Sequence, residues 1–388
     1  MAPSPTTPFD LVLLGATGFT GGLTAAYLAE HAPAGCRWAI AGRNPAKLAA
    51  VAAALDGPHP PDGTLLVDTT DEGSLLALVS QTRVVASTVG PYLHHGEALV
   101  AACATAGVDY LDITGEPEFV DTMYLRHHAA AVASGARLVH CCGFDSIPHD
   151  LGAFFTVQQL PEGVPLTIDG YVRAGGRPSG GTFHSAVNAF SRLRQSAAAA
   201  KERAAAEPAL ADGRRARSAV ARPSRHEGWA LPMPTIDPEI VARSARALPR
   251  YGPDFTYRHH VQVSHLSSAV GLAVGLPVLV GLAQLAPTRN LLLGRIAQGD
   301  GPTEEQRDAG WFEVAFEGEG GGRRVRTKVS GGDPGYTETA KMLGETALCI
   351  AFDDVAPSRG QVTTAQACGQ ALVDRLQQAG IAFEVITD

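Results

Sequence analysis

The sequence has few of the features that mark metal-binding, secreted or nucleic-acid-binding proteins. Its six cysteines form no CxxC pair and no histidine cluster accompanies them, which argues against zinc and against a disulfide framework. The formal net charge of −8 argues against a surface for nucleic acid. The chain does not open with a basic segment followed by an apolar run, so we expect no secretion signal. These absences favour a cytoplasmic protein without a bound metal.

Two catalytic signatures are also missing. The chain has no G-x-S-x-G elbow, which argues against a serine hydrolase. No lysine lies four residues after Tyr92, where Gly96 stands, so the Tyr-x-x-x-Lys pair found in some reductases is absent. Tyr92 could still donate a proton or a hydrogen bond, but the absence of that lysine favours a packing role.

The length of 388 residues, of which 45% are hydrophobic, is enough for two domains with separate cores. From residue 10 to about 142, short apolar runs alternate with helical patterns, as in a parallel sheet with crossover helices. The candidate strands are Leu11–Leu14, Arg37–Ala41, Thr64–Val67, Val84–Val89, Tyr110–Ile113 and Arg137–Cys141. The predicted fold class is α/β, with a Rossmann-like doubly wound parallel sheet whose ligands bind beyond the carboxyl ends of the strands.

A different pattern follows residue 150 and predicts an inserted α+β domain. Residues 166–173 alternate like a half-buried antiparallel strand, and residues 311–330 predict two strands around a glycine-rich turn. A long alanine-rich helix is expected at about 181–206. Helices at about 336–351 and 364–379 precede a strand at 381–386.

We therefore expect three segments along the chain. A Rossmann-like domain covers residues 1–146, and an α+β domain covers residues 147–334. Residues 335–388 supply C-terminal helices and a strand, which can return to either domain.

An apolar segment without charge occupies residues 269–286 of the second domain. Pro277 lies in its middle and three glycines interrupt it. The pattern fits a buried, broken helix, the wall of a tunnel for a long apolar substrate, or a patch that rests on a membrane. Its length is near the lower limit for a spanning helix.

The stretch LVLLGATGFTGGLTAAYLAE, residues 11–30, has three glycines between a strand and a helix. Their G-x-x-G-x-x-G spacing allows a tight turn, a close approach of a pyrophosphate, and packing of the helix on the strand. The helix N-terminus supplies N–H groups and a partial positive charge for the phosphates. The predicted contacts come from Gly15, Ala16, Thr17, Gly18, Phe19, Thr20 and Gly21.

The choice of cofactor is predicted at the end of the second strand, in AGRNPAKL. This segment has no acidic residue to hold a ribose diol, whereas Arg43 is in place and Lys47 follows one helical turn later. A guanidinium fork matches a phosphate, so NADP(H) is favoured, although Arg43 could instead only face solvent. Asp68, after the third strand, can meet the adenine edge or serve in a turn or helix cap.

Later strand ends supply the remaining predicted contacts. STVGPY and TGE follow the fourth and fifth strands and contribute Val89, Gly90, Pro91, Thr114 and Gly115 to the cofactor site. CCGFDSIPHD, residues 141–150, is the densest polar cluster at a strand end. Cys141 and Cys142 are predicted to be buried fillers rather than nucleophiles.

The candidate catalytic residues are Tyr92, Asp145, Ser146 and His149. A hinge or a helix cap explains Asp145 and Ser146 as well as chemistry does, and His149 could be an acid near neutral pH. Tyr336, in a glycine-containing segment, is a further candidate.

The motifs GATGFTG, AGR, STVGPY, DYLDITGE and CGFDSIPHDLG, in this order, resemble those of the saccharopine dehydrogenase-like oxidoreductases. The similarity is closer to the actinobacterial trans-acting enoyl reductases, extends through residues 301–349, and covers nearly the whole chain. The resemblance implies NADPH-dependent reduction of a carbon–carbon double bond in a polyketide or fatty-acyl chain. It also implies an acyl carrier protein or polyketide synthase as partner, because such a reductase serves a synthase without a working enoyl-reducing module.

The main hypothesis is hydride transfer to the β-carbon of an enoyl thioester, followed by protonation at the α-carbon. The alternatives are an NADPH-dependent imine or ketone reductase of secondary metabolism, a non-catalytic NADP-binding protein, and a membrane-associated protein. A homodimer and a peripheral membrane contact remain open. Basic residues between Arg192 and Arg225, and at 323–328, are solvated surface or a contact for a phosphate or a carrier protein.

Overall fold

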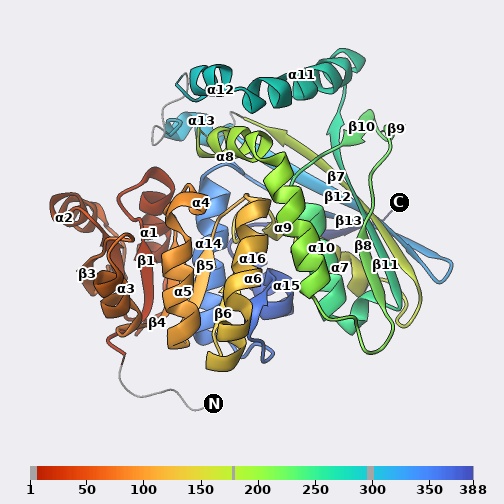
Figure 1. Cartoon of the computed structure of the whole chain (residues 1–388). Helices are drawn as coiled ribbons and strands as arrows, with labels where there is room; N and C mark the ends of the chain where they lie inside the picture. The colour runs from red at the N-terminus through yellow and green to blue at the C-terminus, as the bar shows by residue number, and fades with distance from the viewer. Residues whose placement is uncertain (1–6, 177–179, 295–300, 388) are drawn as a thin grey trace. The chain divides into compact units, whose positions relative to one another are not determined.

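The computed structural model describes residues 7–176, 180–294 and 301–387, with the backbone alone over 180–185 (Figure 1). The chain forms two compact units. The first unit contains the chain up to Thr114 together with Phe119–Gly143 and Tyr336–Arg375; the second contains Gly115–Glu118, Phe144–Gly335 and the chain from Leu376.

The first unit is built on a parallel sheet of seven strands in the order β14-β6-β5-β4-β1-β2-β3. Six of them are the predicted strands, and the seventh, β14, comes from the C-terminal segment. The Rossmann-like prediction is confirmed. The strands are β1 (Phe9–Leu14), β2 (Trp38–Gly42), β3 (Gly63–Leu66), β4 (Thr82–Ser87), β5 (Asp109–Asp112), β6 (Arg137–Val139) and β14 (Gly360–Val362).

Helices bury both faces of this sheet. Val12 and Leu14 of β1 belong to one core with Leu75 and Leu99, and alternation along the strand turns the neighbouring side chains to the opposite face. On that opposite face α1 and α14 pack together and contact β1. The helices are α1 (Phe19–His31), α2 (Pro45–Ala54), α3 (Glu72–Val79), α4 (Tyr92–His95), α5 (Glu97–Ala106), α6 (Pro117–Ser134), α14 (Thr337–Phe352), α15 (Thr364–Ala367) and α16 (Gln370–Gln378).

The second unit is built on a mixed sheet in the order β15-β13-β12-β7-β11-β10-β9, with β8 paired to β11. Strands β7 and β11 are parallel, whereas β12 is antiparallel to both β7 and β13. The strands are β7 (Leu166–Gly175), β8 (Arg215–Ser218), β9 (Ser224–Arg225), β10 (Trp229–Pro232), β11 (Asp254–Val263), β12 (Trp311–Gly320), β13 (Arg323–Gly331) and β15 (Ala382–Ile386).

Helices α7 and α10 pack on this sheet and on each other. The contact is close, since a Cβ added to Gly152 of α7 would lie 2.3 Å from the ring of Phe316 in β12. The helices of this unit are α7 (Ile147–Gln158), α8 (Gly180–Ser191), α9 (Leu193–Ala206), α10 (Asp237–Ala247), the 3-10 helix η1 (Pro249–Tyr251), α11 (Leu266–Gln284), α12 (Ala286–Leu293) and α13 (Glu304–Asp308).

The alanine-rich segment forms two helices, so the prediction of one long helix is wrong. The chain breaks at Arg192, between α8 and α9. The guanidinium of Arg192 donates to both carboxylate oxygens of Glu118, at 2.6 and 2.5 Å. The ion pair accompanies a break that alanine-rich composition alone cannot indicate.

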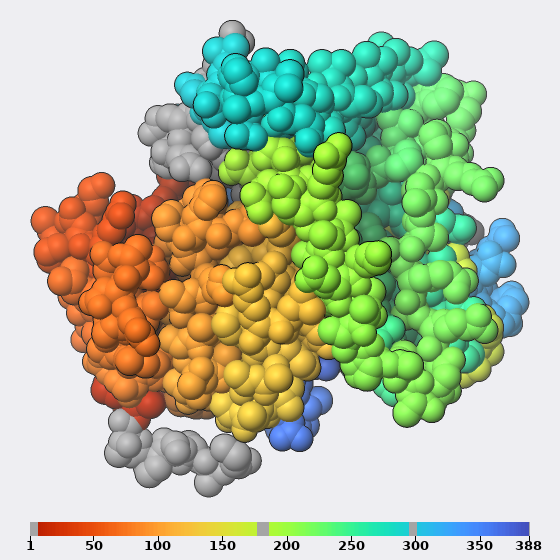
Figure 2. All heavy atoms as spheres, viewed as in Figure 1, coloured from red at the N-terminus to blue at the C-terminus, as the bar shows by residue number. Residues whose placement is uncertain are grey.

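The apolar segment also differs from one of its expected forms. Residues 269–284 lie in a single helix, α11, which runs through Pro277, and Ala286 begins α12. Val270, Val274 and Val278 are 54%, 61% and 55% exposed, so the prediction of a buried, broken helix is wrong. Figure 2 shows α11 and α12 as a continuous band of surface. By length and composition, α11 is the one helix among the described residues that could cross a membrane.

The C-terminal segment serves both units. Helices α14 and α15 and most of α16 belong to the first unit, whereas β15 pairs with β13 in the second. The segment at 364–379 is not one helix, because the chain turns at Gly369, whose φ is +51°. The C-terminal segment thus contributes to both units.

Candidate functional site

The predicted phosphate loop lies between β1 and α1 in the first unit. Gly15 has φ +96°, and a Cβ there would lie 2.6 Å from the hydroxyl oxygen of Thr88. A Cβ at Gly21 would lie 2.1 Å from the carbonyl oxygen of Gly15. Packing therefore requires glycine at these two positions. At Gly18 a Cβ would meet only that carbonyl, at an ordinary 3.4 Å, so the protein's own packing does not account for this glycine.

The N-terminus of α1 has the features of an anion site. Gly18 is its N-cap, no side chain caps the helix, and the first turn has no acidic residue. Thr17 and Gly18 are exposed. The N–H groups and the helix dipole at this end favour a phosphate. Gly18 thus leaves room for the diphosphate of a dinucleotide beside these groups.

Tyr336 lies beside this loop. It is the N-cap residue of α14, and its ring meets Phe19 edge-on with 4.8 Å between the ring centres. The ring is buried. The structure therefore brings the reserve candidate next to the phosphate loop within the first unit.

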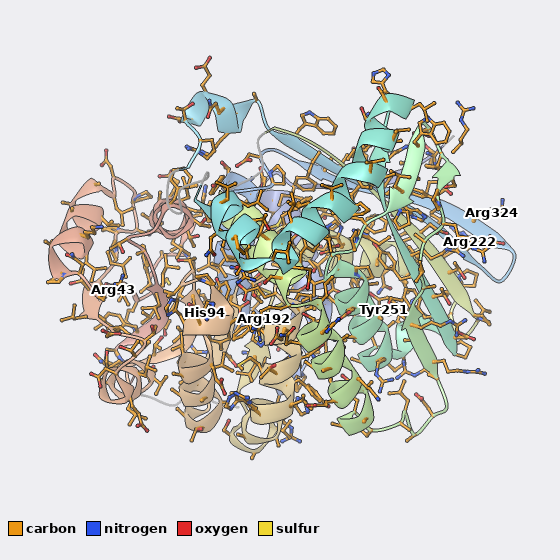
Figure 3. All side chains as sticks on the ribbon, turned by 45° about the horizontal axis from the view of Figure 1, so that its top comes forward. Arg43, His94, Arg192, Arg222, Tyr251 and Arg324 are labelled. Atoms are coloured by element: carbon orange, nitrogen blue, oxygen red, sulfur yellow. The ribbon has the colours of Figure 1, made fainter. Side chains whose placement is uncertain are left out.

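Arg43 and Lys47 are exposed at the N-terminal end of α2, on the first unit in Figure 3. The helix is capped by Asn44, whose side chain accepts a hydrogen bond from the N–H of Lys47 at 3.0 Å. Asp68 follows β3 and accepts from the N–H and hydroxyl of Thr70, and these bonds, together with the charge of Arg43, lower the pKa of its carboxyl group. The turn role predicted as one alternative for Asp68 is present.

Tyr92 ties together two strand ends of the first unit. Its hydroxyl donates to the carbonyl of Ser87 at 3.0 Å and accepts from the N–H of Ile113 at 3.4 Å. The ring is buried and packs 5.8 Å from Phe119. Because its proton is directed at a backbone carbonyl, the packing alternative is favoured over the catalytic one.

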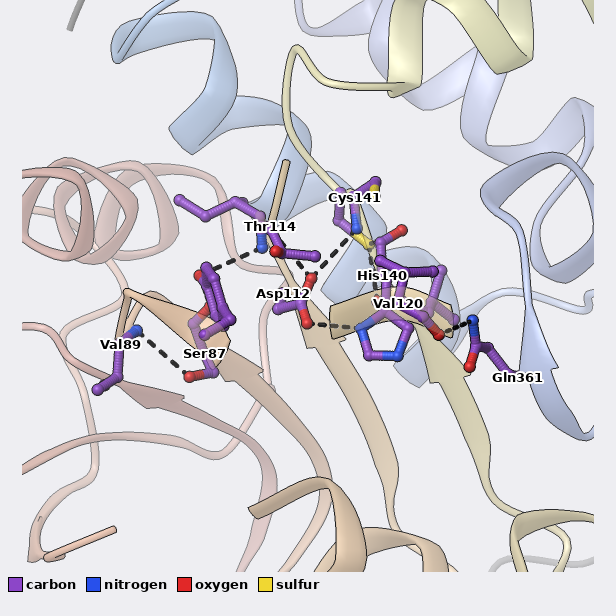
Figure 4. Close-up of polar contacts among 12 residues, drawn as sticks. Ser87, Val89, Asp112, Thr114, Val120, His140, Cys141 and Gln361 are labelled. Atoms are coloured by element: carbon purple, nitrogen blue, oxygen red, sulfur yellow. Dashed lines mark hydrogen bonds and ion pairs between the residues drawn. The ribbon is translucent and has the colours of Figure 1, made fainter. Parts of the chain in front are cut away.

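A buried acid–base pair that sequence reasoning missed lies next to Thr114. Asp112 is fully buried at the end of β5, with one carboxylate oxygen 2.6 Å from Nδ1 of His140. Its other oxygen accepts from the N–H groups of Thr114 and Cys141, at 3.0 and 3.2 Å (Figure 4). The signal in the sequence was an aspartate at a strand end, in DYLDIT. Asp112 fixes the backbone from which Thr114 is predicted to contact the cofactor.

The other residues predicted at strand ends follow β4, β5 and β6. Val89 donates from its N–H to the hydroxyl of Ser87 at 3.3 Å and leads into Gly90 and Pro91. Cys141 and Cys142 are buried, as predicted. Gly115 begins the short stretch that belongs to the second unit.

The other candidate catalytic residues lie in the second unit. Desolvation, with a smaller effect from Asp237, raises the pKa of Asp145 to about 7. Ser146 precedes α7 and its carbonyl accepts from the N–H groups of His149 and Asp150, but its side chain does not cap the helix. The carboxyl group of Asp145 is therefore partly protonated at neutral pH.

The prediction that His149 is an acid near neutral pH is wrong. The imidazole is fully buried in the first turn of α7, and burial lowers its pKa to about 3. The ring is thus neutral at physiological pH. It lies instead beside Asp237 of α10 and His259 of β11, two residues that the sequence did not single out because they are far apart in the chain.

Comparisons with known proteins identify the family. Residues 11–139 match the family described as the saccharopine dehydrogenase NADP binding domain. Over 97% of both chains, this protein is 35% identical to a Mycobacterium tuberculosis protein that is named provisionally as a trans-acting enoyl reductase. It is 33% identical to a trans-acting enoyl reductase of Mycobacterium ulcerans, over 96% of both chains. The chain belongs to the saccharopine dehydrogenase-like oxidoreductases.

The fold agrees with this family. Apo saccharopine dehydrogenase (L-Glu forming) from Saccharomyces cerevisiae superposes with a TM-score of 0.59 at 12% identity, over 98% of this chain and all of the other. As a saccharopine dehydrogenase-like oxidoreductase, the chain has NADP(H) as its cofactor, confirming the prediction made from Arg43 and the glycine loop. The individual contacts of Arg43, Lys47 and the strand-end residues with the cofactor remain predictions.

Proposed function

We propose that this oxidoreductase reduces the carbon–carbon double bond of an enoyl thioester, adding hydride at the β-carbon and a proton at the α-carbon. The supporting observation is similarity to trans-acting enoyl reductases over 96–97% of both chains. Similarity confined to the glycine loop would support only nucleotide binding. Similarity that also covers the second unit supports a shared substrate class.

The cofactor would supply the hydride when bound at the phosphate loop. The protein must then hold the thioester and deliver a proton to the α-carbon. Asp145 is suited to the second task, because a carboxyl group with a pKa of about 7 is partly protonated at neutral pH. The hydroxyl of Ser146 is buried and has no hydrogen-bond partner among the described residues, so it could donate to the thioester carbonyl.

The test is oxidation of NADPH labelled with deuterium at C4, with enoyl thioesters of several chain lengths as substrates. We expect deuterium at the β-carbon of the saturated product. Oxidation with imines or ketones but with no enoyl thioester would favour the alternative reductase. Tight NADPH binding without transfer of deuterium to any substrate would favour the non-catalytic alternative.

A carrier-bound substrate is part of the proposal. Arg222 and Arg324 extend from the second unit in Figure 3, and both are exposed. Exposed arginines of this kind can attract an acidic carrier protein. We expect the same enoyl chain to have a lower KM on an acyl carrier protein than on coenzyme A, and Arg324→Glu to remove that advantage. Equal KM values for both forms would contradict this part of the proposal.

The surface of α11 favours a second property, contact with a lipid surface. Leu266, Val270, Val274, Val278 and Leu282 recur at every fourth residue, and all five are exposed. No acidic residue lies between His265 and Gly294. Apolar area of this extent usually meets a partner or a membrane. A lipid surface would also be a source of long acyl chains.

Vesicle sedimentation tests the lipid contact. We expect the protein to pellet with phosphatidylcholine vesicles, and Val274→Asp with Val278→Asp to leave it in the supernatant. Val385→Asp is the matched control, since Val385 is an exposed apolar residue on β15. A wild-type protein that stays in the supernatant as a dimer, and becomes a monomer in the double variant, would assign α11 to a homodimer interface instead.

A further inference from the structure

Three buried side chains of the second unit meet in one place. His149 lies in the first turn of α7, Asp237 is the first residue of α10, and His259 is in β11. Their exposed fractions are 0%, 0% and 3%. One nitrogen of each imidazole and one carboxylate oxygen all lie within 4.8 Å of one another.

The spacing is too long for hydrogen bonds within the group. Nε2 of His149 is 3.7 Å, and Nε2 of His259 is 3.6 Å, from the same oxygen of Asp237. An ion held at about 2.0–2.1 Å by nitrogen and oxygen ligands in a tetrahedral arrangement sets them about 3.4 Å apart. These two nitrogen–oxygen separations therefore match ligands around a shared ion more closely than they match a hydrogen-bonded pair.

Several polar atoms of this group also lack partners among the described residues. They are both ring nitrogens of His149, Nε2 of His259 and Oδ1 of Asp237, whereas Oδ2, the oxygen nearest the imidazoles, accepts from the hydroxyl of Thr235. Buried polar atoms are nearly always hydrogen-bonded or bound to a ligand. Four such atoms in one buried cluster indicate that something outside the protein chain satisfies them.

The surroundings orient the group as a set of ligands. Nδ1 of His259 lies 3.1 Å from the hydroxyl of Tyr257, so an Nδ1–H that donates to this oxygen leaves the lone pair of Nε2 directed at the group. The hydroxyl of Thr235 donates to Asp237 at 2.5 Å and fixes the carboxylate. Hydrogen bonds of this kind commonly position metal-binding histidines and carboxylates.

We propose that His149, Asp237 and His259 bind one divalent transition-metal ion. Two imidazole nitrogens and a carboxylate suit Zn²⁺, and three protein ligands leave a position for water or another ligand. The carboxylate of Asp237 favours a cation over a water molecule. The bound ion would join α7, α10 and β11, because each of these elements carries one of its ligands.

The test uses the full chain with any affinity tag removed, because tags bind metal. We expect elemental analysis to find about one zinc per chain, and the metal-free protein to take up Co²⁺ with visible absorption bands of a low-coordinate site. His259→Gln and Asp237→Asn should abolish both. His260→Gln is the matched control, since His260 is a buried neighbour on the same strand that stacks on Tyr171 outside the group.

Chelation supplies a readout that does not depend on the variants folding. We expect a chelator to lower the Tm of the wild-type protein and of His260→Gln, and added Zn²⁺ to restore it. A wild-type protein that contains no metal and binds neither Zn²⁺ nor Co²⁺ would overturn the proposal, as would uptake by His259→Gln equal to that of the wild type. Enzymatic reduction is not needed for either result, so the metal proposal and the proposed function can fail separately.

Discussion

Each unit buries an aspartate beside histidine, but the two arrangements differ. In the first unit, Asp112 contacts His140 at 2.6 Å and its other oxygen accepts two backbone hydrogen bonds. In the second, Asp237 lies 3.6 and 3.7 Å from two imidazoles and hydrogen-bonds to neither. The same residue types at the same depth thus form a closed pair in one unit and an open set of ligands in the other. The distance between carboxylate and imidazole distinguishes the two arrangements.

Replacing each aspartate by alanine should give the largest difference in the free energy of unfolding between the two arrangements. We expect Asp112→Ala to lower the free energy of unfolding by about 3–5 kcal/mol, because it strips His140 and two N–H groups of their acceptor. In metal-free protein, Asp237→Ala should cost no more than about 1–2 kcal/mol, the loss of its bond from Thr235. Urea denaturation in the presence of a chelator measures both changes in the free energy of unfolding. Equal losses would mean that the two groups do not differ as described.

Arg43→Glu tests cofactor binding by the first unit separately from metal binding by the second. We expect NADPH affinity to fall by about 2–3 kcal/mol, or roughly 30–150-fold, because a carboxylate replaces the predicted partner of the 2′-phosphate. NADH affinity should change only a few-fold, and the metal content of the second unit should not change. Calorimetric titration checks this, with Lys47→Gln as a milder variant. A similar loss for both nucleotides would contradict the assignment of Arg43 to the phosphate.

The proton on Asp145 makes stability depend on pH. Its folded pKa of about 7 exceeds the ordinary value of 3.8, so between these values the folded protein binds a proton that the unfolded chain releases. The contribution of this group to stability is therefore greatest below that range, falls as the pH rises through it, and is constant above about 7.

Asp145→Asn should remove this slope in metal-free protein. After allowance for the partial exposure of the side chain, we expect the variant to be more stable than wild type at alkaline pH by about 1–2 kcal/mol. Denaturation curves at a series of pH values give the slope. A wild type whose stability is independent of pH through this range would refute the raised pKa.

Tyr92→Phe is the smallest change. The variant loses the hydrogen bonds to Ser87 and from the N–H of Ile113, and should be about 1 kcal/mol less stable than wild type, while its turnover stays within a few-fold. A loss of turnover greater than a hundredfold, with stability unchanged, would instead restore Tyr92 as a catalytic residue.

The sequence was sufficient where the chemistry is local. Gly15, Gly18 and Gly21 lie within one loop, and Arg43 follows its strand directly, so spacing alone predicted the nucleotide fold and its cofactor. The break at Arg192 was not predictable, because it coincides with an ion pair to Glu118 elsewhere in the chain. His149, Asp237 and His259 were also missed as a group. They come from two helices and a strand that only tertiary packing brings together.

The exposure of α11 could not be decided from its composition. An uncharged helix with glycines and a proline fits a core, a tunnel or a lipid surface equally well, and the choice depends on which elements cover it. The role of Asp112 was missed for a different reason. Its strand-end position was visible in the sequence, but its partner His140 lies inside the next predicted strand, Arg137–Cys141, and was not singled out.

The late position of α14 in the chain affects how the protein is made. This helix covers β1, β4 and β5, although those strands end by residue 112. A ribosome therefore releases six of the seven strands of the nucleotide sheet long before it releases the helix that shields one face. Until then, apolar strand surface stays open to chaperones and to neighbouring chains. Slow or interrupted synthesis of the last fifty residues should thus appear as aggregation of the nucleotide-binding half, with no change in any residue of its own.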